Sequence, residues 1–309
     1  MNVLNRVFIF TAICLCAVST DVRAESEYPF SSLYVFGDSL SDPGNAFAVT
    51  GETANPPFEP IPSAAYGVGG HHFSNGRTWV EVMAQKMGLN QGAKPAFRDP
   101  AFGNYAFAGA RAMTGTSPGF DTQVQMYLAV HGCVPQPNAL YVVQFGGNDL
   151  RDALEAAQMG QNPAPILGDA ITTIAQNIGI LAACGAEHFL IANAPNLGAA
   201  PAVAPEFKTL VADLSFQFNY ILAGTLAAYL PTDLNIYNLD MFGFVTAAAA
   251  MPEGFGLTNG TTPCLTFGVT DGAFCQDRDG HLFWDAIHPT KTAHRLIGEI
   301  ALGALPVAD

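Results

Sequence analysis

Residues 33–42 read LYVFGDSLSD, a short apolar run that ends at Gly37 and continues directly into Asp38 and Ser39. An apolar run of this length, closed by a glycine, is typical of a buried strand. Further runs of this kind follow at residues 105–108, 140–145, 189–192 and 234–239. The sequence therefore predicts about five short strands.

Between these runs, apolar residues recur at intervals of three and four, which is the period of an amphipathic helix. This pattern predicts helices over residues 78–87, 122–130, 166–183 and 206–229, and a C-terminal helix over 292–305 with Thr290 as its N-cap. Strands that alternate with such helices need crossover connections, which give a parallel sheet with both faces covered. We therefore expect an α/β fold with three layers, α/β/α, around a mostly parallel, roughly five-stranded sheet.

Composition excludes several classes of protein. Of the 309 residues, 50% are hydrophobic and only 12% are charged, so the chain can bury a large core and is not a disordered or coiled-coil sequence. The formal net charge is -14, and no run of basic residues occurs. The electrostatic signature of a nucleic-acid-binding protein is therefore missing, and we expect no nucleic-acid partner.

The N-terminus has the pattern of an export signal. One positive charge precedes an apolar stretch at residues 7–19, and Val22-Arg23-Ala24 provides the small residues that signal peptidase accepts. The apolar stretch is shorter than the roughly 20 residues that span a bilayer. We expect a signal peptide at residues 1–24, no transmembrane segment, and a secreted mature chain at 25–309 that forms one domain.

The mature chain keeps four cysteines, Cys133, Cys184, Cys264 and Cys275. An even number of cysteines in an oxidising compartment indicates disulfides. Cys264 and Cys275 enclose a short glycine-containing loop that can close easily, so we expect this pair, and Cys133 with Cys184 is a second candidate pair that stays open. No cysteine or histidine spacing typical of a zinc site occurs, so we expect no metal ion.

Polar residues follow the predicted strands at the points where ligands bind in open parallel sheets. Ser39 follows the first strand, where we expect its N–H near the start of a helix, and Gly109 and Asn148 follow two others. Asp285 and His288 stand three residues apart before the C-terminal helix. Acyl transfer needs these groups: a hydroxyl nucleophile, an imidazole base, a carboxylate that orients the base, and N–H donors for an oxyanion.

Four ordered stretches resemble the conserved blocks of the GDSL lipases and esterases, which belong to the SGNH hydrolase superfamily. They are FGDSLSD at 36–42, NYAFAGA at 104–110, GGND at 146–149 and FWDAIHPT at 283–290. The resemblance implies that Ser39 is the nucleophile, His288 the base and Asp285 its orienting partner. It also implies an oxyanion hole formed by Ser39, Gly109 and Asn148, and an enzyme without a metal or organic cofactor.

A second serine has to be weighed, because residues 115–119 read GTSPG and match the G-x-S-x-G pattern of another hydrolase fold. In that pattern the residue after the serine donates an oxyanion N–H, and Pro118 has none. We therefore interpret Ser117 as part of a turn.

The resemblance is strongest to the secreted bacterial lysophospholipases, phospholipases A and lipases, which implies a lipid or other ester substrate. Whether that substrate lies at a membrane surface stays open. Three other functions stay open at this point. They are transfer of the acyl group to an alcohol such as a sterol, removal of acetyl groups from carbohydrates, and a non-catalytic role as a lipid-binding module or adhesin.

Two segments have more than one interpretation. The apolar stretch 242–251 could pack in the core, line a groove for an acyl chain, or face lipid. The loop between Cys264 and Cys275 precedes Asp285 directly, so it could either limit entry to the site or serve as a simple staple.

Overall fold

The computed structural model describes residues 27–51, 53–54, 65–66, 71–112, 118–134 and 136–308. The expected signal peptide at 1–24 and Ser117 lie outside these residues.

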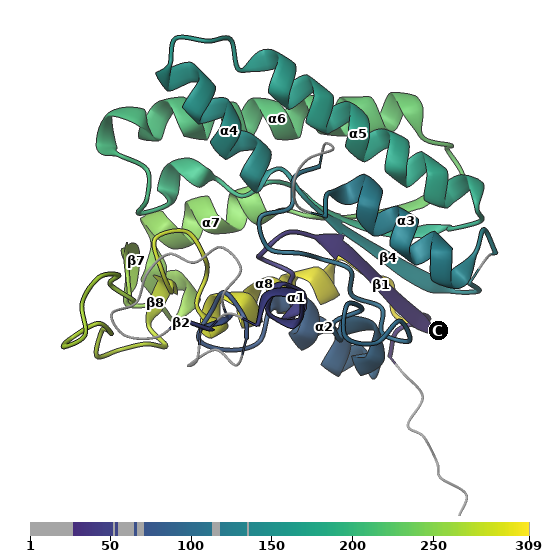
Figure 1. The fold of residues 1–309 in the computed structure, drawn as a ribbon, viewed down its shortest axis with the longest axis horizontal. Helices are drawn as coiled ribbons and strands as arrows, with labels where there is room; N and C mark the ends of the chain where they lie inside the picture. The colour runs from purple at the N-terminus through teal and green to yellow at the C-terminus, as the bar shows by residue number, and fades with distance from the viewer. Residues whose placement is uncertain are drawn as a thin grey trace, which may run out of the picture.

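A parallel sheet forms the centre of the molecule (Figure 1). Its four strands are β1 (Ser32–Gly37), β4 (Ala139–Gln144), β5 (His188–Ala192) and β6 (Asn235–Leu239), in the spatial order β1-β4-β5-β6. Every residue of β4 is buried, as expected for an inner strand that is covered on both faces. The predicted α/β class is therefore confirmed.

The expected fifth strand at residues 105–108 does not form, and this prediction was wrong. The segment lies along the outer edge of β1, where the Tyr105 N–H donates to the Val35 carbonyl at 2.8 Å and the Phe107 N–H to the Gly37 carbonyl at 3.0 Å. The N–H of Gly37, which would donate to the Tyr105 carbonyl in a continuous ladder, instead donates to the side chain of Gln123 at 2.9 Å. A side chain thus replaces part of the ladder, and only an isolated bridge remains.

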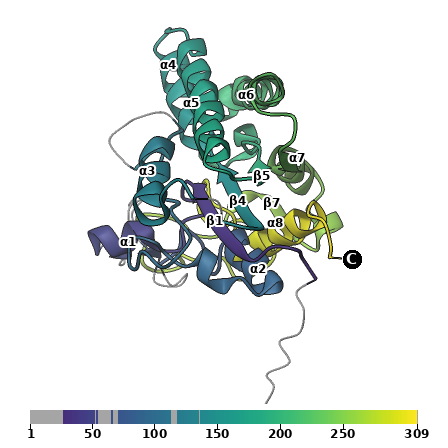
Figure 2. The same ribbon diagram turned by 90° about the vertical axis from the view of Figure 1, so that its right-hand side faces the viewer.

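Helices cover both faces of the sheet and complete the three layers (Figure 2). One face carries α3 (Phe120–His131), α4 (Gly147–Gln158), α5 (Ala164–Ala183) and α6 (Lys208–Tyr229). The other face carries α2 (Trp79–Met87), α7 (Met241–Ala250) and α8 (Lys291–Gly303).

Successive side chains of each strand point to opposite faces of the sheet, so each face packs against its helices in its own hydrophobic core. In β1, Tyr34 and Phe36 pack with the first group of helices, whereas Leu33 and Val35 pack with the second. The remaining short elements connect these layers. They are α1 (Asn45–Thr50), β2 (Thr53–Ala54), β3 (Ala65–Tyr66), β7 (Asn259–Pro263), β8 (His281–Phe283), and the 3-10 turns η1 (Asn90–Ala93), η2 (Leu197–Ala199), η3 (Pro205–Phe207) and η4 (Pro252–Phe255).

The predicted helices are found within about two residues of their expected ends. Thr290 caps α8, because its hydroxyl accepts a hydrogen bond from the Ala293 N–H at 3.2 Å. Thr78 caps α2 in the same way and forms a capping box with Glu81.

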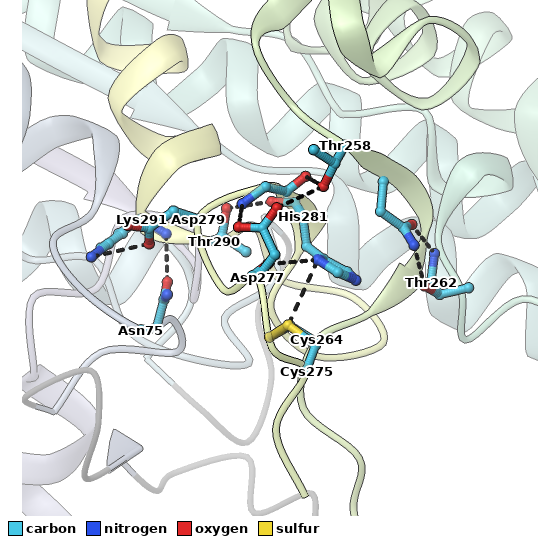
Figure 3. The surroundings of a disulfide bond; sticks show 12 residues. Asn75, Thr258, Thr262, Cys264, Cys275, Asp277, Asp279, His281, Thr290 and Lys291 are labelled. Atoms are coloured by element: carbon cyan, nitrogen blue, oxygen red, sulfur yellow. Dashed lines mark hydrogen bonds and ion pairs between the residues drawn. A yellow bond between two sulfur atoms is a disulfide. The ribbon is translucent and has the colours of Figure 1, made fainter. Parts of the chain in front are cut away.

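Both candidate disulfides are present, Cys133–Cys184 and Cys264–Cys275. Figure 3 shows the second, with the Cys275 sulfur 3.6 Å from Nδ1 of His281. Its loop is fixed to the segment that precedes Asp285, since the Leu265 N–H donates to the Trp284 carbonyl at 2.6 Å. The disulfide therefore supports the chain that carries part of the expected site.

By length and apolar composition alone, α5 could cross a membrane. In the structure, its Ile171, Ile174 and Ile178 are buried in the same cluster as Tyr141 and Phe189 of the sheet. This helix is thus packed as a core element.

Candidate active site

Ser39 lies in a tight turn immediately after β1. The turn is closed by a hydrogen bond from the Ser41 N–H to the Asp38 carbonyl at 3.1 Å. The Asp38 carboxylate accepts a further bond from the Leu40 N–H at 3.0 Å. Helix α1 begins only at Asn45, so the expectation that the Ser39 N–H sits at a helix start was wrong. The turn itself leaves the Ser39 side chain partly exposed.

His288 reaches Ser39 from the opposite end of the chain. Its Nε2 lies 2.8 Å from the Ser39 Oγ, across 249 residues of sequence. Its Nδ1 lies 2.7 Å from a carboxylate oxygen of Asp285. Asp285 cannot donate when it is ionised, so Nδ1 carries the proton in the neutral ring and Nε2 is left to accept the Ser39 hydroxyl proton.

A local turn holds Asp285 in this position. One of its carboxylate oxygens accepts the backbone N–H groups of Ile287 at 2.7 Å and His288 at 2.6 Å. The other oxygen is thereby left for the imidazole, and the side chains of Asp285 and His288 are 4% and 14% exposed. The spacing of three residues thus does what the sequence predicts, because a single turn presents both groups together.

The charges of this pair shift both pKa values. Burial lowers the pKa of the His288 imidazole, but the Asp285 carboxylate outweighs that effect and holds the pKa above its usual value. Burial raises the pKa of Asp285, and the neighbouring His288 and the N–H donors of its turn bring it below the usual value. The site therefore stabilises an imidazolium next to a carboxylate.

The expected oxyanion donors lie close to one another. Asn148, in the first turn of α4, donates from its side-chain nitrogen to the Ala110 carbonyl at 2.8 Å. Ala110 follows Gly109, which has a φ of 78° that favours glycine. Asn148 also lines the same cavity as Ser39. The structure thus brings the Gly109 turn, Asn148 and Ser39 into one neighbourhood.

A glycine sets the start of α4 and hence the position of Asn148. Gly146 has a φ of 113°, and a Cβ there would lie 2.7 Å from the ring of Phe218. Only glycine accommodates both the backbone conformation and the close packing of α6 at this point.

Asp42 links segments that are far apart in the sequence. Its carboxylate accepts N–H groups from the start of α1, including Gly44 at 2.7 Å, and also the Ala108 N–H at 2.9 Å. Asn45 makes a similar link, donating to the carbonyls of Asn104 at 2.8 Å and Ala106 at 2.7 Å. The sequence indicates local hydrogen bonding for both residues, but nothing in their spacing reveals these long-range partners.

An apolar cavity of about 220 Å³ opens beside Ser39 and Asn148. Its walls come from α4, α6, α7 and α8 and from the turn around η2, with Leu154, Val211, Val245 and Ile297 among the lining residues. Part of the apolar stretch 242–251 therefore lines a groove, while Phe244 from the same helix is buried in the core. The cavity lining includes no residue of the loop between Cys264 and Cys275.

Asp38 also borders this cavity and is only 2% exposed. Burial raises the pKa of its carboxyl to about 6, although the Leu40 N–H and the nearby His288 oppose the shift. Within the described residues, no group of three or more His, Cys, Asp or Glu side chains is placed to hold a metal ion.

The fold and the hydrogen-bonded series from Ser39 to His288 to Asp285 define an α/β protein with its polar groups arranged as in serine hydrolases. Comparison with known sequences identifies the family. The chain belongs to the GDSL-like lipase/acylhydrolase family, whose sequence model matches residues 33–301.

Two sequence relatives agree with this membership, and one solved structure is reported beside them. A GDSL esterase/lipase of Arabidopsis thaliana is 28% identical, and the match covers 89% of this chain and 88% of the plant protein. The thermolabile hemolysin of Vibrio parahaemolyticus is 25% identical over 87% of this chain and 62% of the hemolysin. A solved structure of a lipolytic G-D-S-L family member from Veillonella parvula matches 88% of this chain and 96% of that chain, with 15% identity and a TM-score of 0.48. Family and relatives support hydrolysis of esters as the activity.

Proposed function

We propose that the protein is a secreted hydrolase of lipid acyl esters, of the lysophospholipase or phospholipase A type, that works through an acyl-Ser39 intermediate. The observation that carries the proposal is the 2.8 Å contact between Ser39 Oγ and His288 Nε2 at the mouth of an apolar cavity. A nucleophile beside such a cavity suits an ester whose acyl part is a hydrocarbon chain.

The mechanism follows from the hydrogen bonds of the site. His288 Nε2 takes the hydroxyl proton of Ser39 while Oγ attacks the ester carbonyl carbon, and Asp285 stabilises the imidazolium that forms. The carbonyl oxygen becomes negative and is bound by N–H groups of Ser39, Gly109 and Asn148. Collapse of this intermediate expels the alcohol, which takes the proton from His288.

Water completes the reaction. It attacks the acyl carbon while His288 accepts one of its protons, and the fatty acid leaves as Ser39 regains its proton. No metal or organic cofactor takes part in the proposed scheme, because each proton and charge is handled by a side chain of the site.

The cavity predicts a preference for esters with longer acyl chains. Each methylene group moved from water into an apolar site contributes about 0.8 kcal/mol, or roughly a fourfold gain in kcat/KM. This gain should continue until the cavity is filled. Acetyl esters of carbohydrates have no such methylene groups, so the cavity would give a carbohydrate acetylesterase no gain in kcat/KM.

A turnover panel tests the proposal. It compares lysophospholipid, diacyl phospholipid, triglyceride and acetylated sugar, and the lipid esters should be the faster substrates. The variant Val245→Phe, which narrows the cavity from α7, should reduce turnover of long-chain esters more than that of acetyl esters. Faster release of acetate from sugars, or equal losses for both chain lengths, would argue against a lipid substrate.

The same panel, run with cholesterol present, measures transfer of the acyl group to an alcohol. Free fatty acid as the main product supports the hydrolase proposal, and a cholesteryl ester as the main product contradicts it.

Export is part of the proposal and rests on residues 1–24. Expression in a secreting bacterial host should place the protein outside the cytoplasm with Glu25 as its first residue, which mass spectrometry of the intact protein measures. Retention of residues 1–24 in the cytoplasm would contradict secretion.

A further inference from the structure

Arg151 is the only lysine or arginine among the described residues that line the cavity beside Ser39. It lies on α4, three residues after Asn148 and three before Leu154, both of which line the same cavity. Because a helix rises about 1.5 Å per residue, Arg151 stands about 4.5 Å along the axis from the expected oxyanion donor. A positive side chain is thus placed about one helical turn from the expected oxyanion donor.

The guanidinium of Arg151 is not committed to a partner within the described part of the chain. Its side chain is 46% exposed, and its one ion-pair contact is a long one, 4.0 Å to Asp152. Asp152 is already engaged by Arg111, which uses two nitrogens on the carboxylate, one of them at 2.8 Å. Arg151 therefore keeps its donors available to a ligand in the cavity.

Another surface arginine shows the contrast. Arg295 is 49% exposed, about as much as Arg151, but it lies 2.7 Å from both oxygens of the Glu299 carboxylate. The guanidinium of Arg295 is thus paired closely with a carboxylate of the chain itself. Within the described residues, the guanidinium of Arg151 has no carboxylate at such a short distance.

Charge also sets Arg151 apart. The chain carries a formal net charge of -14, and Asp38 borders the same cavity. The field of Arg151 reaches the reacting centre, since it is one of the influences that lower the pKa of His288. A cation in this position offsets the acidic surroundings for a negatively charged substrate group.

We propose that Arg151 binds the phosphate of a glycerophospholipid or lysophospholipid while the acyl ester of that lipid lies at Ser39. This inference rests on the proposed function and narrows its substrate to lipids with a phosphate headgroup. In such lipids, the ester and the phosphate are both carried on one glycerol unit. The forked guanidinium matches phosphate oxygens with two parallel hydrogen bonds, which a neutral glyceride does not offer.

The test compares two esters with the same octanoyl chain, a lysophosphatidylcholine and a monoacylglycerol. In Arg151→Gln, kcat/KM for the phosphate ester should fall roughly 10- to 100-fold further than kcat/KM for the neutral ester, as expected for loss of a hydrogen bond between charged groups. Any general effect on the pKa of His288 acts on both esters and cancels in this ratio. Arg151→Lys keeps the charge and loses the fork, so it should give an intermediate ratio.

Arg295→Gln is the matched control, because it removes one positive charge of similar exposure from a residue that does not line the cavity. It should leave the ratio of the two esters unchanged, and thermal melts should show all variants folded. An equal loss for both esters in Arg151→Gln overturns the phosphate role while leaving the proposed lipid hydrolase intact. A wild-type protein that cleaves acetyl esters but neither octanoyl ester overturns both.

Discussion

At the scale of single residues, the pairing of His288 with Asp285 determines how the activity responds to pH. The neutral imidazole is the form that accepts the Ser39 proton, and the carboxylate raises the pKa of His288 above about 6.5. Activity should therefore be complete at alkaline pH and be lost as pH falls through this raised pKa. A profile of kcat/KM against pH measures the midpoint, and a flat profile between about pH 5 and 8 contradicts the role of His288.

Asp38 provides a matched variant for that profile. Its negative charge is one of the influences that raise the pKa of His288, so Asp38→Asn should move the midpoint to lower pH.

We expect the Asn148 side chain to contribute to turnover as a hydrogen-bond donor to the oxyanion, in addition to its bond with the Ala110 carbonyl. Asn148→Ala removes a side-chain donor from the proposed oxyanion site, and kcat should fall roughly 10²- to 10³-fold. Asn162→Ala, at an exposed position after α4, is the control and should leave kcat close to wild type. A loss below about threefold in Asn148→Ala would exclude this side chain as an important donor.

Residues differ in how far their roles can be predicted from the sequence. Asp285 and His288 are adjacent along the chain, so their contact follows from local geometry alone. The availability of Arg151 depends on Arg111, forty residues away in sequence, having already engaged Asp152. Such competition for partners is a property of the folded chain and leaves no local pattern.

At the scale of elements, the two disulfides close loops of different length and should differ in their contribution to stability. Cys133–Cys184 spans 51 residues and joins the end of α3 to the end of α5, whereas Cys264–Cys275 spans 11. The entropy of loop closure gives about 4 kcal/mol for the longer loop and about 3 kcal/mol for the shorter one.

Double serine variants of each pair measure this difference by denaturant unfolding. The variant without Cys133–Cys184 should be the less stable of the two. A larger loss of stability on removing Cys264–Cys275 would show that its contacts with the Trp284 segment outweigh loop entropy.

The elements that sequence patterns predict well are those with a sustained period. Helices α5 and α6 are long enough for their apolar residues to repeat over several turns, and both were predicted within about two residues. The segment at 105–108 has the composition of a strand but lies at the sheet edge, where the Gln123 side chain accepts the Gly37 N–H that a ladder would use. Composition alone does not distinguish a strand with a continuous ladder from an edge segment without one.

At the scale of the whole molecule, the parallel sheet explains why distant residues meet. The carboxyl ends of β1 and β4 lie at the same edge, which brings Ser39 and Asn148 to one cavity. Packing of α8 and the turn before it against the second face then delivers His288. This meeting could be predicted from the polar residues that follow the predicted strands together with the resemblance to the GDSL family. The cavity, in contrast, arises from the packing of α4, α6, α7 and α8 and could not be predicted from any one of them.

The most direct test of the account is covalent labelling by a fluorophosphonate probe, followed by mass spectrometry of the labelled peptide. The account predicts that wild-type protein is labelled on Ser39, that Ser39→Ala is not labelled, and that His288→Gln reacts far more slowly because the hydroxyl loses its base. Labelling at Ser117, or no labelling of folded wild-type protein, would contradict it.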